Sequence, residues 1–263
     1  MCELLAANCA LPTDIRFSLT GFCRRGGGSR HHADGFGAAF FDGPTARLYI
    51  DDKASVNSNV AAHLLANPIL TQNAIAHIRK ATRGKISMDN SHPFSREWQG
   101  RHWVFAHNGH LEKWKPKHKK WKYAPVGQTD SELAFCMLLS RLDDIFSGLK
   151  PSLESIFAEV CAIADDIGQH GTFNFVLSDG RCLIARCSTH LHHLTRQSPF
   201  GTARLLDVDA CMDFSEINSA SNKIALIATD PLTSGEPWVA MDPGEACLFV
   251  DGVIAKQRKR ERA

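Results

Sequence analysis

The chain opens with Met1-Cys2-Glu3-Leu4-Leu5-Ala6-Ala7, whose apolar run predicts a buried β-strand that begins almost at the first residue. Methionine removal is usual before a small residue, and we expect it to leave Cys2 with a free α-amine. That amine titrates at about pH 7.7–8.0 and a thiol at about 8.5, so one residue would carry a nucleophile and a base of matched pKa. Cys2 alone favours an ordinary buried first strand, since one residue is weak evidence, and the rest of the chain changes that balance.

Downstream of this strand, short apolar runs separated by turn residues predict several more strands. The runs on either side of Gly43-Pro44 predict a hairpin, and Asp179-Gly180 and Asp251-Gly252 are strong hairpin turns as well. The polar stretch 84–100 predicts a loop. The predicted strands cover residues 2–7, 38–41, 47–50, 75–79, 103–107, 172–177, 182–186, 225–228 and 247–250.

Two long helices are predicted in the middle of the chain. Apolar residues at 135, 138, 139 and 142 form one helical stripe, with Thr129 or Asp130 as its N-cap. A second stripe runs from Leu153 to Ala164, and Gly168 would end that helix. Strands followed by two helices and then more strands favour layers of sheet and helix around one core over alternating βαβ units.

Composition sets limits on the class of protein. The 263 residues suit one large domain or two small ones, with 44% hydrophobic and 22% charged residues, as in ordinary globular proteins. A net charge of +2 gives no strong field toward nucleic acid. No apolar run approaches the roughly 20 residues that span a bilayer, and the N-terminus lacks the pattern of a signal peptide. We therefore expect no membrane association.

Nine cysteines are scattered at irregular spacing, and no CxxC pair occurs. The odd number and the spacing disfavour a disulfide framework or a structural zinc site and fit a reducing, cytoplasmic compartment. Most of these cysteines lie in apolar runs and are expected to be small buried side chains.

Two clusters of chemically active side chains receive plain structural interpretations. His190, His192 and His193 have metal-ligating side chains, but no acidic or cysteine partner stands at ligand spacing, so surface histidines on a strand are favoured. The segment Trp114–Tyr123 interleaves lysines with aromatics, a pattern that binds single-stranded nucleic acid in some proteins. Such a segment more often forms a loop exposed to solvent. We expect no metal, no cofactor and no nucleic acid.

A site that attacks amides needs donors for the developing oxyanion and charges that hold the substrate. Asn108-Gly109, at the end of a predicted strand, offers a side-chain amide and a backbone N–H, although an ordinary Asn-Gly turn has the same sequence. Arg79, with Thr82 nearby, is placed to bind a carboxylate bidentately. Asp130 is the candidate partner for an α-ammonium, and helix capping is its alternative role.

Taken together, these segments resemble the class II glutamine amidotransferases. The chain ending resembles the stand-alone, YafJ-type branch of that family, and the likeness extends to about Gly252. Any one segment is weak evidence, but six in family order are highly specific. The matching segments are Met1-Cys2-Glu3-Leu4-Leu5, Asp34-Gly35-Phe36-Gly37, His77-Ile78-Arg79-Lys80-Ala81-Thr82, Asn90-Ser91-His92-Pro93-Phe94, Ala106-His107-Asn108-Gly109 and Gly127-Gln128-Thr129-Asp130-Ser131-Glu132, with the ending Ala228-Thr229-Asp230-Pro231-Leu232-Thr233, Glu236-Pro237-Trp238 and Pro243-Gly244-Glu245.

The resemblance implies an α+β fold, the four-layer αββα sandwich of N-terminal-nucleophile (Ntn) hydrolases, with two antiparallel sheets between helical layers. It implies that Cys2 is the nucleophile and that its amine is the base. The matched Asn108 and Gly109 would form the oxyanion hole. The substrate would be held by Arg79, Thr82 and Asp130, with His92 in a supporting role. Residues 2–252 would form the amidotransferase domain and residues 253–263 a charged C-terminal tail.

The biosynthetic members of the family carry a second domain that consumes ammonia, and this chain shows no such segment. We therefore expect glutamine hydrolysis through a γ-glutamyl thioester, with three alternatives. The first is hydrolysis of γ-glutamyl peptides or derivatives, as carried out by family members of similar size. The second is transfer of the ammonia to a separate synthase subunit. The third is a non-enzymatic protein that binds γ-glutamyl ligands as a subunit of a larger complex. The substrate and the oligomeric state stay open.

Overall fold

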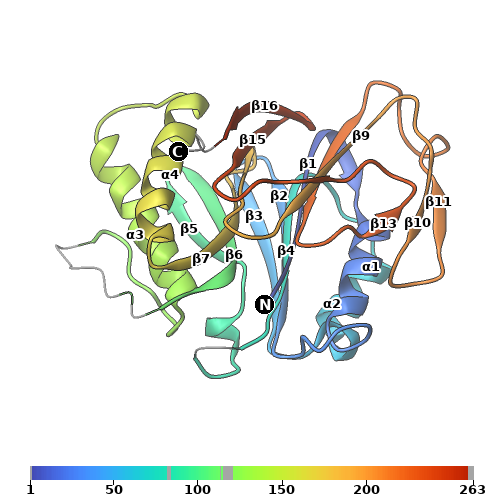
Figure 1. Ribbon diagram of the computed structural model, residues 1–263, viewed down its shortest axis with the longest axis horizontal. Coiled ribbons are helices and arrows are strands. Elements are labelled where there is room, and N and C mark those ends of the chain that lie inside the picture. The colour runs from blue at the N-terminus through green and yellow to red at the C-terminus, as the bar shows by residue number, and fades with distance from the viewer. Residues whose placement is uncertain (1, 82–83, 113, 115–120, 260–263) are drawn as a thin grey trace.

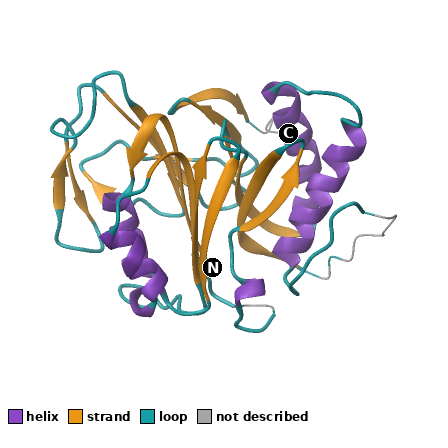
Figure 2. Ribbon diagram, turned by 180° about the vertical axis from the view of Figure 1, so that it is seen from behind, coloured by secondary structure: helices purple, strands orange, loops and turns teal. Residues whose placement is uncertain are grey.

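Two antiparallel β-sheets face each other in the computed structural model, and helices cover the outer face of each sheet (Figures 1 and 2). The structure describes residues 2–81, 84–112, 114 and 121–259. This arrangement confirms the predicted α+β class and the αββα layering.

The first sheet has seven strands in the order β14-β9-β12-β1-β4-β2-β3. The N-terminal strand β1 lies at its centre between β4 and β12, with Leu5 opposite both Ala76 and Ala228. The strands are β1 (Glu3–Asp14), β2 (Phe36–Asp42), β3 (Thr45–Asp51), β4 (Leu70–Ile78), β9 (His192–Gln197), β12 (Lys223–Ala228) and β14 (Val239–Ala240).

The second sheet has six strands in the order β16-β15-β8-β7-β6-β5. A small third sheet, β11-β10-β13, lies beside the first one at the edge of the molecule (Figure 1). The strands are β5 (Phe94–Trp98), β6 (Arg101–Leu111), β7 (Gly171–Ser178), β8 (Leu183–Arg186), β10 (Thr202–Leu205), β11 (Cys211–Asp213), β13 (Thr233–Ser234), β15 (Ala246–Val250) and β16 (Val253–Arg258).

Three apolar layers hold this arrangement together, and the alternation of side chains along β1 shows why. Leu4 and Ala6 point into the layer between the two sheets, whereas Leu5 and Ala7 point toward the helices of the first sheet. Both faces of a strand at the centre of the sandwich are buried, so β1 is apolar at the consecutive positions from Leu4 to Ala7 rather than at alternate ones. This is the physical reason for the continuous apolar run at the chain start.

The helices form the outer layers. The first sheet is covered by α1 (Arg16–Arg25) and α2 (Asn59–Ala66), and the second by α3 (Asp130–Ile145) and α4 (Leu153–Gly168). Short 3₁₀ turns, η1 (Ser55–Asn57) and η2 (Met88–Asn90), complete the list. The N-cap of α3 is Thr129, whose side chain accepts a hydrogen bond from the Glu132 N–H at 3.2 Å. None of the helices in the described residues is long and apolar enough to cross a membrane.

Several local predictions were wrong. The predicted loop 84–100 contains strand β5, and the helices α1 and α2 were missed. Residues 253–258, which were expected to belong to a charged tail, form β16 and pair with β15 beyond the Asp251-Gly252 turn. Pairing with β15 is what orders a segment whose side chains are too polar to predict a buried strand. The three predicted hairpins are confirmed.

The nine cysteines are all free thiols. Seven of them are buried, Cys2 is half-buried and Cys211 is exposed. The expectations that no disulfide framework forms and that most of these side chains are buried are therefore confirmed.

Candidate active site

Cys2 lies immediately before β1, at the rim of a pocket between the two sheets. Its Sγ accepts a hydrogen bond from the Lys80 backbone N–H at 3.3 Å and lies 3.5 Å from the Lys80 carbonyl oxygen. Burial raises the pKa of the Cys2 thiol, and the opposing effects of the Lys80 backbone and of the Arg79 charge do not reverse this. The resting sulfur is therefore a neutral thiol that needs a base.

Arg79 enters the same pocket from the end of β4, because β1 and β4 are neighbours in the first sheet. The side chain is buried, and one of its Nη1 protons goes to the Lys85 carbonyl at 2.9 Å. Burial lowers the pKa of Arg79. A desolvated guanidinium on a pocket wall is a favourable place for an anion such as a carboxylate.

Asp130 is the first residue of α3, and it lines the pocket together with Thr129 and Ser131. Because Thr129 makes the cap, the Asp130 carboxylate is free of that role and instead accepts the Leu111 N–H at 2.7 Å. Of the two roles predicted for Asp130, capping is therefore wrong. The hydrogen bond to Leu111 fixes the carboxylate against the end of β6.

Asn108 and Gly109 lie inside β6 rather than at its end, which corrects the predicted boundary. Gly109 lines the pocket, and a Cβ at this position would lie 1.9 Å from the Thr172 carbonyl oxygen, so only glycine fits. The Asn108 Nδ2 lies 3.2 Å from Thr229 Oγ1, whereas its buried Oδ1 has no hydrogen-bond partner among the described residues. Thr229 also accepts the Leu4 N–H at 2.9 Å.

Three histidines stand side by side between the sheets next to this pocket. The rings of His77 and His92 pack at an angle of 36° with their centroids 4.1 Å apart, and the His77 Nε2 lies 3.2 Å from the His107 carbonyl oxygen. Burial lowers the pKa of His77 to about 3 and the pKa values of His92 and His107 in the same direction, so all three are neutral near pH 7. Neither ring nitrogen of His92 has a hydrogen-bond partner in the described part of the chain.

The site predicted from sequence is thus assembled in one place. Cys2, Arg79, His92, Gly109 and Asp130 line one pocket, and Asn108 is buried beside Gly109 in the same strand. The remaining substrate-binding candidate, Thr82, lies outside the described residues.

A model of the family described as class-II glutamine amidotransferases matches residues 1–263. The chain belongs to the class II glutamine amidotransferase family. The Escherichia coli K12 protein YafJ is 44% identical over 252 residues, which cover 96% of this chain and 98% of YafJ. A Haemophilus influenzae Rd relative is 45% identical over 252 residues, 96% of this chain and 85% of the relative.

Solved structures agree with this membership. A predicted glutamine amidotransferase from Pseudomonas aeruginosa PA01 superposes with a TM-score of 0.77 at 37% identity, over 97% of this chain and 100% of that one. The glutamine phosphoribosylpyrophosphate amidotransferase of Bacillus subtilis has a TM-score of 0.54 at 14% identity, over 98% of this chain and 49% of that one. At this low identity the second likeness concerns the fold alone.

Sequence reasoning missed several residues that hold this candidate site in shape. Ser131 positions His107 through a 2.8 Å contact to Nδ1, and Asn174 donates to the Asn108 carbonyl at 2.9 Å. Glu132 accepts the Gly127 N–H at 2.7 Å and so folds the preceding loop onto α3. Ser131, Glu132 and Thr229 stand in segments quoted for the family resemblance, and that was the available signal. Asn174 carries no such signal.

The predicted histidine cluster also differs from expectation. His193 is buried, whereas His190 is exposed and contacts Asp230, an acidic partner 40 residues away that local spacing did not reveal. The basic, aromatic segment lies mostly outside the described residues, but its first residue, Trp114, is buried in the core beneath α3 and α4.

Proposed function

We propose that this protein hydrolyses the γ-amide of glutamine or of a related γ-glutamyl compound, with Cys2 as nucleophile after removal of Met1. The observation that carries the proposal is the pocket in which Cys2, Arg79, Gly109 and Asp130 meet. These residues come from four segments of the sequence, and each offers a different group that amide cleavage of an amino acid requires.

The charged pair Arg79 and Asp130 accounts for recognition of the substrate. Arg79 would bind the α-carboxylate bidentately, because its guanidinium is buried and a carboxylate restores its lost solvation. Asp130 would accept the α-ammonium, and its bond to Leu111 keeps the carboxylate in place. Thr82, whose segment resembles the family, would share this binding function, and His92 would support the pocket as a neutral ring.

The raised pKa of Cys2 explains why the nucleophile needs its own α-amine. In the first step the amine takes the thiol proton while sulfur attacks the amide carbon. The tetrahedral intermediate collapses as the ammonium returns a proton to the leaving nitrogen, and the C–N bond breaks. Ammonia or an amine departs and a γ-glutamyl thioester remains. Water then attacks the thioester with the amine again as base, and glutamate and the free thiol are released.

The oxyanion formed in both steps would be stabilised by the Gly109 N–H and the Asn108 side-chain amide. Because the Asn108 Oδ1 has no hydrogen-bond partner in the described part of the chain, the opposite orientation of the amide is the one that would serve the oxyanion. Rotated by half a turn, the carboxamide would place Oδ1 next to Thr229, whose hydroxyl can donate its proton to Oδ1 while its oxygen still accepts from the Leu4 N–H. Both Nδ2 protons are then available to the site, so we assign Thr229 as the residue that positions Asn108.

A glutamine-analogue diazoketone tests the assignment of the nucleophile. We expect one equivalent of added mass on Cys2, and none on Cys211, which as the exposed thiol serves as the internal control. Iodoacetamide, a general alkylator, should by contrast label Cys211. Analogue labelling that follows exposure rather than Cys2, or undiminished turnover in Cys2→Ala, would contradict the proposal.

The fate of the nitrogen is tested with a panel of γ-glutamyl amides and peptides assayed for glutamate release by the purified protein. We expect turnover without any added protein, and intact mass spectrometry should show that Met1 is absent. Activity that requires one co-purifying protein would instead establish a transferase subunit. Retained Met1 together with tight binding and no turnover would favour the non-enzymatic alternative.

A further inference from the structure

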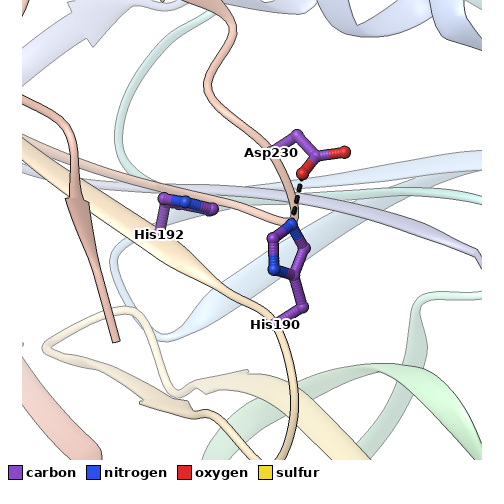
Figure 3. A group of neighbouring side chains, drawn as sticks. All are labelled: His190, His192 and Asp230. Atoms are coloured by element: carbon purple, nitrogen blue, oxygen red, sulfur yellow. Dashed lines mark hydrogen bonds and ion pairs between the residues drawn. The ribbon is translucent and has the colours of Figure 1, made fainter. Parts of the chain in front are cut away.

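Outside the catalytic pocket, two histidines and one carboxylate converge where the chain enters β9 and leaves β12. His192 is the first residue of β9, His190 lies in the loop before it, and Asp230 follows β12 by two residues. One ligand atom from each side chain can be chosen so that all three lie within 4.8 Å of one another. Figure 3 shows the three side chains directed toward one another from the two neighbouring segments.

The ring of His192 is held in the state that a metal requires. Its Nδ1 lies 2.9 Å from the Thr229 carbonyl oxygen. A carbonyl only accepts hydrogen bonds, so Nδ1 must carry the proton and Nε2 keeps a lone pair in the neutral ring. Backbone carbonyls orient metal-ligating histidines in the same way in known sites.

Asp230 divides its two oxygens between two partners. Oδ1 contacts the His190 Nε2, and Oδ2 contacts the Arg30 guanidinium. A cation placed between the carboxylate and His190 would replace the first contact and keep the second. Arg30 then acts as the outer hydrogen-bond donor that orients a ligating carboxylate.

The charges around this point tolerate an added cation. Arg30 also contacts Glu3, which pairs with Arg25 at 3.5 Å, and Arg25 pairs with Asp207 at 2.8 Å. Three carboxylates thus face two guanidiniums, which leaves one negative charge in excess. A site with only the Arg30–Asp230 pair would be neutral and would repel a second cation more strongly.

We propose that His190, His192 and Asp230 form a binding site for a divalent first-row transition cation, with Zn²⁺ as the expected occupant. Two imidazoles and one carboxylate are a common zinc ligand set that leaves the fourth tetrahedral position to water. Bond lengths of about 2.0–2.1 Å place tetrahedral ligand atoms about 3.3 Å from one another, so His190 would move away from Asp230 and toward His192. The exposed His190 side chain can make that adjustment. The bound cation would tie the loop before β9 to the segment that carries Thr229.

The experiment uses the full-length chain in a Cys2→Ser background, since the α-amine and thiol of an N-terminal cysteine would themselves chelate zinc. The chelator-treated protein is titrated with Zn²⁺ by calorimetry, and with Co²⁺ followed by visible absorption. We expect one equivalent bound in both titrations and a rise in Tm with Zn²⁺. His190→Ala, His192→Ala and Asp230→Asn should each weaken binding at least about tenfold.

His63→Ala is the matched control, because His63 is an exposed histidine on α2 outside the cluster, and it should leave the affinity and the Tm rise unchanged. The proposal fails if the Cys2→Ser protein binds no saturable equivalent. It also fails if the three cluster variants bind Zn²⁺ as tightly as their parent. Neither outcome depends on catalytic activity, so the result stands apart from the proposed hydrolase function.

Discussion

Removal of the Thr229 hydroxyl is the sharpest test of how the oxyanion hole is built. Thr229→Val keeps the shape of the side chain and deletes both hydrogen bonds, to the Leu4 N–H at 2.9 Å and to the Asn108 amide at 3.2 Å. Thr229→Ser keeps the hydroxyl and serves as the matched variant. Any difference between the two therefore reports on the hydroxyl.

The expected magnitudes follow from burial. The Leu4 N–H is fully buried, and a buried donor without an acceptor costs about 1–3 kcal/mol of unfolding free energy. In a protein of this size each kcal/mol lowers Tm by roughly 2–4 °C. Loss of an entire oxyanion-hole donor lowers kcat by about 10²–10³. Since Asn108 remains and loses only its anchor, we expect a decrease of about ten- to a hundredfold.

The assay is steady-state glutamate release from the best γ-glutamyl substrate, with Tm measured on the same samples. Thr229→Val should lower kcat and leave KM within about twofold, because the oxyanion develops in the transition state and the tetrahedral intermediate and is absent from the bound substrate. Thr229→Ser should stay within about threefold of the parent. Equal kcat values for the Val and Ser variants would refute the positioning role, even if the Val variant were less stable. A change confined to KM would place the hydroxyl in substrate binding instead.

Four further predictions address binding and ionisation. Arg79→Lys keeps the charge but loses the bidentate geometry, so KM should rise by the equivalent of roughly 1.5–3 kcal/mol. Asp130→Asn should reduce the preference for substrates with a free α-ammonium. Both effects are measured as KM values across the substrate panel. Because the Cys2 thiol stays protonated, its reaction with the diazoketone depends on the α-amine as base. The labelling rate should therefore rise as the α-amine loses its proton at about pH 7.7–8.0. A chain that retains Met1 has no free amine on Cys2 and should lack this rise. Burial lowers the pKa of His77 to about 3, so below about pH 6.5 the unfolded state binds more protons than the folded state. The free energy of unfolding, measured in urea, should therefore fall as the pH decreases from about 6.5 toward 3. His77→Gln should reduce the first part of this fall, and His63→Gln should leave it unchanged.

Local patterns were sufficient where an element depends on its own residues. The N-terminal strand, the hairpin turns at 179–180 and 251–252, and the long helix α3 all follow from apolar periodicity and turn chemistry. The weaker elements failed for identifiable reasons. Helix α1 has no side-chain cap, and a glycine lies at its centre. Strand β5 carries Ser95, Arg96 and Glu97 between its buried ends, so its sequence alone is typical of a loop.

The catalytic candidates were predictable because each stands in a short segment with its own chemical signal and the segments recur in family order. The supporting contacts were not predictable. Thr229 and Leu4 are 225 residues apart, and His190 and Asp230 are 40 residues apart. Such pairs meet only because β1 lies between β4 and β12, and because β9 pairs with β12. The sequence by itself thus determined which groups are available to the proposed reaction, the thiol of Cys2 and the charges that would fit an amino acid. The tertiary structure alone decided which of them meet and with what neighbours, since pairing between strands distant in sequence depends on burial that no local pattern records.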